Sequence, residues 1–435
     1  MFRQITKISS TAIPITRNFF SEKRVLFRLL KFPYAIKQII KNKKTCELLS
    51  FIYWEICYWL GLFEKITFTN TPPVLINSFG DKNRILLLEN ESFRIRISDL
   101  QWKMRFQCNG NKNIGCLHSN PCQLVCIDNT DEIVWSKKFS HELLSLHVNS
   151  IGTVIVCLAN GQIFCSEDNG NSFLNTLTLT HEDCYFRFEF GITETPDGII
   201  IIGEYGNLQK KGRFSSVANI YFSIDNGNSW KFTNHLIKQG VNKHIHLVKY
   251  SDIINQLILT DGDNRKKMWC CHQDDLIGHT KEPEIKMFNK KHIRLGGFTS
   301  FLEHNNKAIF GTDYNGGTNF IVTTNNYITF NKLVIPDPYR RCPVYALKKR
   351  RSQNGIEIWA NLHNSTITNS KSLVMVSRDN GQSWIRVFEY CGHNNRVHFV
   401  SNSNKIENSI VICITELSNS PGESEKPLIT YEITD

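Results

Sequence analysis

Acidic residues follow apolar runs at three places in this chain of 435 residues, where they could act as acids, bases or nucleophiles. They are Glu204 with Tyr205 in IIIIGEY, Asp261 with Asp263 in LILTDGDN, and Asp313 in AIFGTD. Glycoside hydrolysis needs one carboxylic acid to protonate the leaving oxygen and a second carboxylate as base or nucleophile. We therefore predict Glu204, Tyr205, Asp263 and Asp313 as catalytic residues. Turn chemistry is the favoured explanation for Asp261, because Asp and Gly are common turn formers.

Arginines and histidines lie at the beginning of several other strand-like segments. His244 and His246 alternate, so on a β-strand they would share one face. A ring of guanidinium and imidazole groups suits carboxylates, phosphates or acidic sugars. The predicted ligand-binding residues are Arg187, His244, His246, Arg294, Arg341 and Arg396. The alternative is that these side chains satisfy loop carbonyls and channel waters, since buried polar groups are generally paired.

Other kinds of site have less support. His244 and His246 with Asp263 could hold a divalent ion, but two histidines on one strand face more often form hydrogen bonds. The chain has no phosphate-binding loop, no dinucleotide fingerprint and no GxSxG elbow. We therefore predict neither a metal nor a cofactor.

Three segments nearly coincide and indicate a repeated hairpin. They are IFCSEDNGNSF at 163–173, IYFSIDNGNSW at 220–230 and VMVSRDNGQSW at 374–384. In such a turn the Asp carboxylate accepts backbone hydrogen bonds, the Gly supplies a positive φ, and the aromatic ring covers the hairpin. We predict structural roles for Asp168, Gly170, Asp225, Gly227, Trp230, Asp379, Gly381 and Trp384.

Weaker copies extend the repeat. IVTTNNYITF at 321–330 has Asn325 in place of the Asp, and MWCCHQDDL at 268–276 has Gln273. Turn positions 168, 225, 273, 325 and 379 are then 57, 48, 52 and 54 residues apart. A period of about fifty residues, all of them strands and turns, is the length of one four-stranded propeller blade. A degenerate hairpin at 122–135, a strand at 84–97 and strands at 396–433 would complete an all-β propeller of six or seven blades.

The three strong hairpins resemble the Asp-box, SxDxGxTW, of sialidase-like propellers, and the likeness spans about 122–384. The resemblance implies a structural turn on the outer edge of each blade, so it identifies a fold and not a reaction. The order of the GEY, Asp-box, HxH, TDGD and GTD segments also looks like a group of uncharacterised Asp-box proteins, for which no reaction is known.

A sialidase of this superfamily would have three arginines for the sugar carboxylate, an Asp acid/base and a Tyr–Glu nucleophile pair, with Phe-Arg-Ile-Pro near its start. FRIRI at 93–97 lacks the Pro. The resemblance would assign the first arginine to Arg94 and the nucleophile pair to Glu204 and Tyr205. The other arginines would come from Arg187, Arg294, Arg340 or Arg396.

The basic charge is concentrated at the N-terminus. Residues 1–44 hold eleven Lys or Arg and one acid, so they carry +10 of the net charge of +11. The rest of the chain is close to neutral, which gives no support for a nucleic-acid groove. The aromatic run at 48–63 is too short to span a bilayer and has Glu55 at its centre. It could lie in an anionic membrane interface, or it could pack against the main domain.

These observations predict a helical extension at 1–70 and a propeller at 74–435. The expected function is recognition of an acidic glycan at the propeller mouth, with sialidase-like hydrolysis if the carboxylates are catalytic. The alternative is a non-catalytic protein-interaction scaffold, held at a membrane surface by residues 1–63. The fourteen cysteines show no CxxC pairing and no signal peptide precedes them, so we expect a reducing, cytoplasmic location, peripheral to membrane if 1–63 bind lipid.

Overall fold

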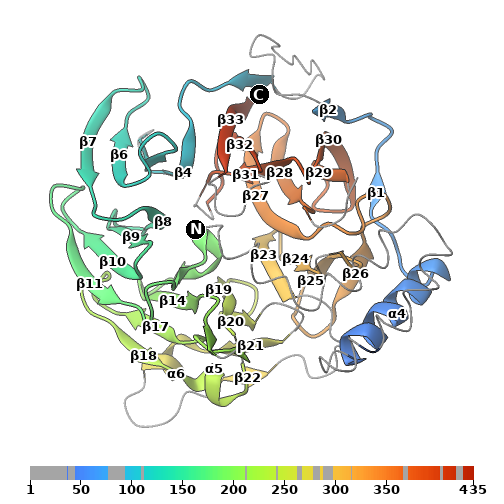
Figure 1. Cartoon of the computed structure of the whole chain (residues 1–435), viewed down its shortest axis with the longest axis horizontal. Helices are drawn as coiled ribbons and strands as arrows, with labels where there is room; N and C mark the ends of the chain where they lie inside the picture. The colour runs from blue at the N-terminus through green and yellow to red at the C-terminus, as the bar shows by residue number, and fades with distance from the viewer. Residues whose placement is uncertain are drawn as a thin grey trace.

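The computed structural model describes residues 37, 45–76, 94–108, 112–210, 213–241, 243–261, 267–277, 285–287, 297–314, 316–365, 371–401, 405–417 and 425–435. Within these residues seven sheets of four or more strands are arranged as a ring, which is a seven-bladed β-propeller (Figure 1). The predicted all-β propeller is therefore confirmed, and the number of blades is seven. No helix among these residues combines the length and the apolar character needed to cross a bilayer.

Blades 1 to 3 follow one another along the chain. Blade 1 contains β4 (Trp102–Gln107), β5 (Asn113–Leu117), β6 (Gln123–Ile127) and β7 (Ile133–Lys138). Blade 2 contains β8 (Leu143–Val148), β9 (Val154–Leu158), β10 (Gln162–Ser166) and β11 (Leu174–Thr178). Blade 3 contains β12 (Tyr185–Phe186), β13 (Ile192–Glu194), β14 (Ile200–Tyr205), β17 (Ile220–Ser223) and β18 (Lys231–Thr233). It also carries the 3-10 helix η1 (Phe188–Phe190) and a small hairpin of β15 (Gln209–Lys210) and β16 (Arg213–Phe214).

Blades 4 to 7 complete the ring. Blade 4 contains β19 (Ile245–Ser251), β20 (Gln256–Asp261), β21 (Met268–Cys271) and β22 (Lys286–Met287), with short helices α5 (His235–Lys238) and α6 (Gln273–Ile277). Blade 5 contains β23 (Gly297–His304), β24 (Lys307–Asp313), β25 (Phe320–Thr324) and β26 (Asn331–Val334). Blade 6 contains β27 (Val344–Ser352), β28 (Gly355–Leu362), β29 (Lys371–Ser377) and β30 (Ser383–Cys391). Blade 7 contains β31 (Asn395–Phe399), β32 (Ile410–Glu416), β33 (Lys426–Thr434) and β3 (Arg94–Ile97).

Strands from both ends of the chain close the ring. β3 pairs antiparallel with β33, so the seventh blade takes its outermost strand from the N-terminal part of the chain. The predicted N-terminal strand at 84–97 is therefore confirmed for 94–97, and its remainder lies outside the described residues. Arg94 is exposed on this outermost strand, so the assignment of Arg94 as a sugar-binding arginine of the central mouth is wrong.

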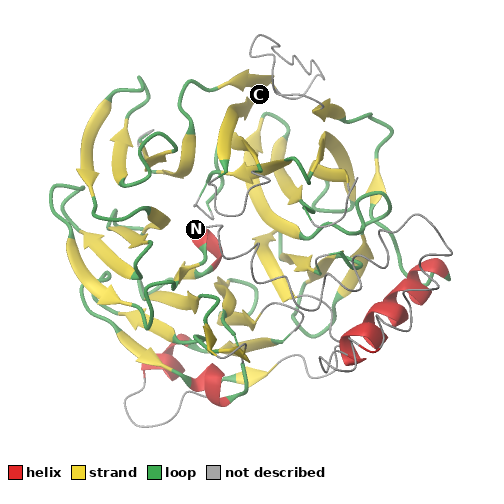
Figure 2. Cartoon of the chain, viewed as in Figure 1, coloured by secondary structure: helices red, strands yellow, loops and turns green. Residues whose placement is uncertain are grey.

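Helix α4 (Thr45–Trp59) lies outside the ring, beside blade 5 (Figure 2). The chain after it adds β1 (Thr67–Phe68) and β2 (Val74–Ile76), which both pair in parallel with β30 on the outside of blade 6. Contact with the propeller therefore begins inside the segment predicted as the helical extension at 1–70.

The three strong hairpins share one hydrogen-bond pattern. In the first, Asp168 accepts hydrogen bonds from the amide and the hydroxyl of Ser172 at 2.9 and 2.6 Å. These bonds lower the pKa of Asp168 to about 2. Ser166 donates to the same carboxylate and accepts a hydrogen bond from the amide of Gly170, whose φ is +90°. Asp225 and Asp379 make the corresponding bonds, so the predicted turn chemistry is confirmed.

The aromatic residue of the hairpin covers the turn as predicted. Trp230 donates from Nε1 to the carbonyl of Gly227 at 3.0 Å and to Thr176 Oγ1 of blade 2 at 3.2 Å. Trp384 is completely buried. The hairpins therefore also hold neighbouring blades together, which the sequence did not indicate.

The two weaker copies depart from the prediction. In blade 5 the side chain of Asn326, and not Asn325, accepts the hydrogen bonds from the amides of Ile328 and Thr329. In blade 4, α6 begins at Gln273 in place of the tight turn, although β21 and β22 still pair antiparallel. The degenerate hairpin of blade 1 is present, with Asp128 capping the turn through the amide of Thr130 at 2.9 Å.

The cysteines from Cys57 to Cys413 are free thiols. Cys157 and Cys165 are buried in the cores between blades. Burial raises the pKa of Cys157 to about 12. Both thiols therefore act as small apolar side chains.

Gly170 provides a test of the contact between blades 1 and 2. A Cβ at this position would lie 2.4 Å from the Trp135 ring of blade 1, in addition to the strain of its positive φ. We expect Gly170→Ala to lower the free energy of unfolding, measured by urea denaturation, by about 2–4 kcal/mol.

Gly152→Ala is the matched control for this prediction. Gly152 lies in the same blade with φ +97°, but a Cβ there would have no neighbour within 4 Å. Gly152→Ala should lower the free energy of unfolding by only about 1 kcal/mol, from backbone strain alone. Equal losses for the two variants would contradict the proposed packing of Trp135 on the hairpin.

Candidate functional site

Strand register places most of the predicted site residues at one end of the ring. The beginnings of inner strands pair with the ends of second strands, as in Tyr185 opposite Tyr205 and Gly297 opposite Asp313. Arg396 lies opposite Thr415 in the same way in blade 7. We call this end of the ring the mouth. Asp263 and Arg294 lie outside the described residues.

Glu204 is a buried structural acceptor. Its Oε1 accepts hydrogen bonds from the amide and hydroxyl of Thr180 at 2.9 and 2.5 Å. Its Oε2 accepts from Asn219 Nδ2 at 2.6 Å and from the Tyr221 hydroxyl at 3.3 Å. The carboxylate thus joins β14 to β17 and to the connection between blades 2 and 3. Its catalytic role stays a prediction, and this full set of internal partners does not support it.

Tyr205 points away from Glu204, because neighbouring residues of a strand face opposite sides of the sheet. Its ring lies against the rings of Tyr185 and His244, with centroids 5.0 and 4.0 Å away. The structure therefore separates the two residues that the sialidase resemblance joins as a nucleophile pair, and that pairing is wrong.

The two histidines form a hydrogen-bonded pair. His244 donates from Nδ1 to the carbonyl of Gly206 at 2.6 Å, and its Nε2 lies 3.0 Å from Nε2 of His246. One of the two Nε2 atoms therefore donates a hydrogen bond to the other. Both rings are buried. His244 thus bonds to a backbone carbonyl, which was the alternative to ligand binding for these side chains.

The described arginines of the predicted site also have partners within the protein. Arg187 donates to the carbonyl of Thr299 across the ring. Arg396 pairs with Glu425 at 3.0 Å and lies over the Tyr345 ring at 5.5 Å. Burial by itself would raise the pKa of Glu425, but the charges of Arg396 and His398 outweigh it and lower that pKa strongly.

The two aspartates of the second strands differ in their surroundings. Asp261 is buried and accepts a hydrogen bond from the amide of Lys267 at 3.0 Å, as the turn interpretation predicted. Asp313 is half-buried at the end of β24. No group of three His, Cys, Asp or Glu side chains in the described ranges is arranged to bind a metal ion.

A charged cluster in the centre of the ring was not predicted. η1 contacts the inner strands β8, β19 and β23 of three other blades. The Glu189 carboxylate of η1 lies 2.6 Å from Nζ of Lys348, and Lys249 donates to the carbonyls of Glu189 and Ile192. Burial lowers the pKa of Lys249 to about 7. The sequence signal was a lysine inside each of two apolar strands, HLVKYS and YALKKR.

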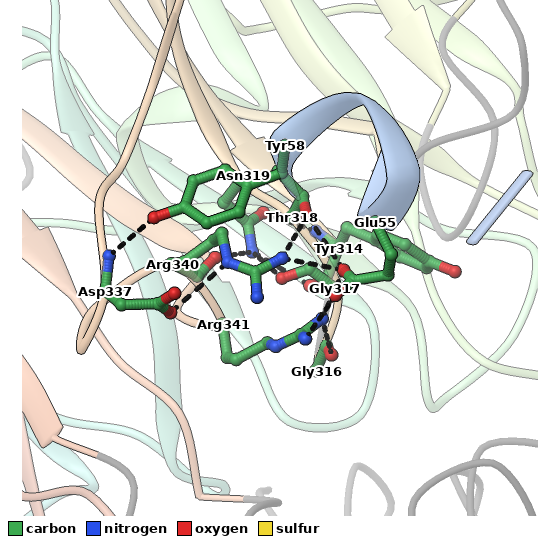
Figure 3. A network of polar contacts seen from close by, with 10 residues as sticks. All are labelled: Glu55, Tyr58, Tyr314, Gly316, Gly317, Thr318, Asn319, Asp337, Arg340 and Arg341. Atoms are coloured by element: carbon green, nitrogen blue, oxygen red, sulfur yellow. Dashed lines mark hydrogen bonds and ion pairs between the residues drawn. The ribbon is translucent and has the colours of Figure 1, made fainter. Parts of the chain in front are cut away.

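Arg341 binds helix α4 (Figure 3). Glu55, at the centre of this helix, accepts two hydrogen bonds from Arg341 and one from Arg340, each 2.7 Å long. Arg340 also lies 4.0 Å from the centre of the Tyr58 ring. Burial by itself would raise the pKa of Glu55, but Arg341 and Arg340 outweigh it and lower that pKa. The ligand-binding role of Arg341 stays a prediction, and its bonds to Glu55 do not support it.

Aromatic packing continues this attachment. The Trp54 ring stacks on Phe63 at 5.0 Å and meets Phe320 of β25 edge-on at 5.2 Å. Together with Phe51 and Cys57, Trp54 forms the buried side of α4. The packing of the aromatic run against the main domain, one of the two alternatives for this segment, is thus observed for this side of the helix.

The opposite side of α4 is apolar and exposed. We call it the outer face; it consists of Leu49, Ile52, Tyr53, Ile56 and Trp59, continued by Leu60 and Leu62. Trp59 is 84% exposed and Leu62 is 65% exposed. The spacing of three and four residues keeps these side chains on one side of the helix.

Comparison with known proteins identifies no family. No family model matches the chain, and no curated protein matches it. Among solved structures, YCF48 bound to a D1 peptide is 11% identical with a TM-score of 0.46, over 85% of this chain and 98% of that one. A chain of the mitotic checkpoint complex is 11% identical with a TM-score of 0.47, over 78% and 93%. Likenesses this weak carry no argument about function.

Glu204→Gln tests the structural role of this carboxylate. The amide NH₂ group of a glutamine can only donate, so it would face at least one of the donors that now bond to Glu204. We expect a loss of about 2 kcal/mol in the free energy of unfolding. The exposed Glu182 is the control, because Glu182→Gln should change stability by less than about 0.5 kcal/mol. Equal stability of the two variants would show that the hydrogen bonds of Glu204 contribute nothing.

Glu55→Gln tests the attachment of α4. Loss of the charge-assisted hydrogen bonds to Arg341 and Arg340 should cost about 2 kcal/mol, so that protection of the α4 amides against hydrogen exchange falls about thirtyfold. Glu64→Gln is the control, because Glu64 is exposed. Unchanged protection in Glu55→Gln would contradict the role of this network.

The same network gives the pH dependence a direction. The pKa of Glu55 is lowered in the folded protein. Its ion pairs therefore stabilise the attachment of α4 fully above pH 4.5, the ordinary pKa of a glutamate, and this stabilisation is lost as pH falls through the lowered pKa. The difference in α4 protection between the wild-type chain and Glu55→Gln should therefore shrink on acidification.

Proposed function

We propose that this chain is a non-catalytic interaction scaffold that binds its partners through the outer face of α4. The observation that carries this proposal is the exposure of Ile52, Ile56, Trp59 and Leu62 on a helix whose other side is buried against blade 5. A helix that is apolar all round is normally covered all round. An exposed, continuous apolar surface of this kind marks an interaction site.

The attachment of α4 makes this surface suitable for binding. Glu55 is held by two arginines, and Trp54 is packed between Phe63 and Phe320. The outer face is therefore presented on a helix that is already ordered. A preformed surface loses less conformational entropy on binding than a mobile one.

Glycan recognition and hydrolysis, the function expected from sequence, have weaker support. A hydrolase needs two carboxyl groups about 5–10 Å apart beside an open pocket. Among the described residues of the mouth, Glu204 is saturated with internal hydrogen bonds and Arg187 and Arg396 have internal partners. These groups would have to leave their partners before they could hold an acidic sugar.

Photocrosslinking in cells tests the scaffold function. We expect the full-length chain carrying Ile56→p-benzoylphenylalanine to form covalent adducts with a second molecule, detected by mass spectrometry. Ile328→p-benzoylphenylalanine is the control, because Ile328 is 80% exposed on the blade 5 hairpin and not on α4. Absence of adducts at Ile56, or equal adducts at both positions, would refute the proposal. Turnover of fluorogenic glycosides that Glu204→Gln abolishes would refute its non-catalytic part.

A further inference from the structure

The outer face of α4 combines aliphatic and amphipathic aromatic side chains. Ile52 and Ile56 lie along the middle of the helix, and Tyr53 and Trp59 extend the same exposed surface. Tyrosine and tryptophan prefer the boundary between water and hydrocarbon, because each has an apolar ring and one polar group. A helix that lies flat in a bilayer interface typically has such a surface.

The charge of the chain that precedes this helix in the sequence favours a negatively charged partner. Residues 1–44 carry a net charge of +10, and Lys41, Lys43 and Lys44 directly precede the first residue of α4, Thr45. Lys65 is exposed just beyond its end. Cations beside an amphipathic helix are attracted to anionic lipid headgroups.

The tertiary structure removes the main objection to a lipid contact. Glu55 interrupts the apolar run, and a carboxylate at the centre of a lipid-facing surface would be unfavourable. In the folded protein, however, Glu55 is on the propeller side of the helix, where Arg340 and Arg341 neutralise it. The outer face itself consists of uncharged residues.

We propose that the outer face of α4 docks on an anionic lipid bilayer, with the helix parallel to the membrane and the propeller on the aqueous side. This inference rests on the proposed scaffold function and names the partner of the same surface. Apolar insertion and charge attraction act together, so both should be needed for stable binding. A protein partner would use the apolar surface but would give no reason for the basic segment beside it.

Vesicle flotation of the full-length chain is the test. We expect the protein to float with vesicles of phosphatidylcholine and phosphatidylglycerol, and to stay at the bottom with phosphatidylcholine alone. The double substitution Trp59→Asp with Leu62→Asp should weaken binding about a hundredfold, because it places two charges in the apolar contact. Lys41→Gln, Lys43→Gln and Lys44→Gln together should also weaken it about a hundredfold.

Matched variants control for changes of charge and hydrophobicity elsewhere. Ile151→Asp and Ile328→Asp replace two exposed isoleucines of the propeller, 70% and 80% exposed, and should float like the wild-type chain. So should the combination of Lys112→Gln, Lys138→Gln and Lys426→Gln, which removes three exposed lysines of the blades. Thermal unfolding of every variant confirms that it remains folded.

Several outcomes would overturn the lipid proposal. They are absence of flotation with anionic vesicles, equal flotation with neutral vesicles, and flotation that survives the α4 substitutions. Ile56 adducts with another protein, or with residues 1–44 of the same chain, in place of lipid would also overturn it. Adducts with another protein would leave the scaffold function intact, whereas absence of any adduct would refute both.

Discussion

The packing of each blade between two neighbours is the constraint on which the rest of the structure depends. A four-stranded sheet with two apolar faces cannot bury both of them alone, and a ring of blades is the arrangement that covers every face. Pairing of β3 with β33 completes the seventh blade from both ends of the chain. This closure fixes the positions of the mouth, of the charged centre around Glu189 and of the flank on which α4 lies.

Several buried charged side chains serve that assembly. Glu204 joins a strand to the preceding connection between blades, Arg187 reaches a carbonyl of another blade, and Glu189 pairs with Lys348 across the centre. Removing a charge from water is costly unless it is paired or hydrogen-bonded. Each of these buried groups therefore needs the partner that it has within the protein. Glu204, Arg187 and Arg396, three of the described polar residues of the mouth, therefore have partners within the protein.

Helix α4 combines two opposite uses of apolar side chains. Its inner side has the same kind of contacts as the blade cores, with Trp54 against Phe320, and it accommodates one charge through Arg340 and Arg341. Its outer face exposes side chains of the same chemical type to solvent. The ion pairs thus set the orientation of the helix, because a rotation that brought the outer face inward would place Glu55 away from its arginines.

The sequence by itself determined the hairpins, their period of about fifty residues and hence the propeller, because the bonds of Asp168 or Asp225 are made within seven consecutive residues. Only the tertiary structure decided which partner each long-range charge takes. Glu55 and Arg341 are 286 residues apart in the chain. Their contact depends on how the blades and the helix pack, and the residue types along one strand do not show which distant residues this packing brings together.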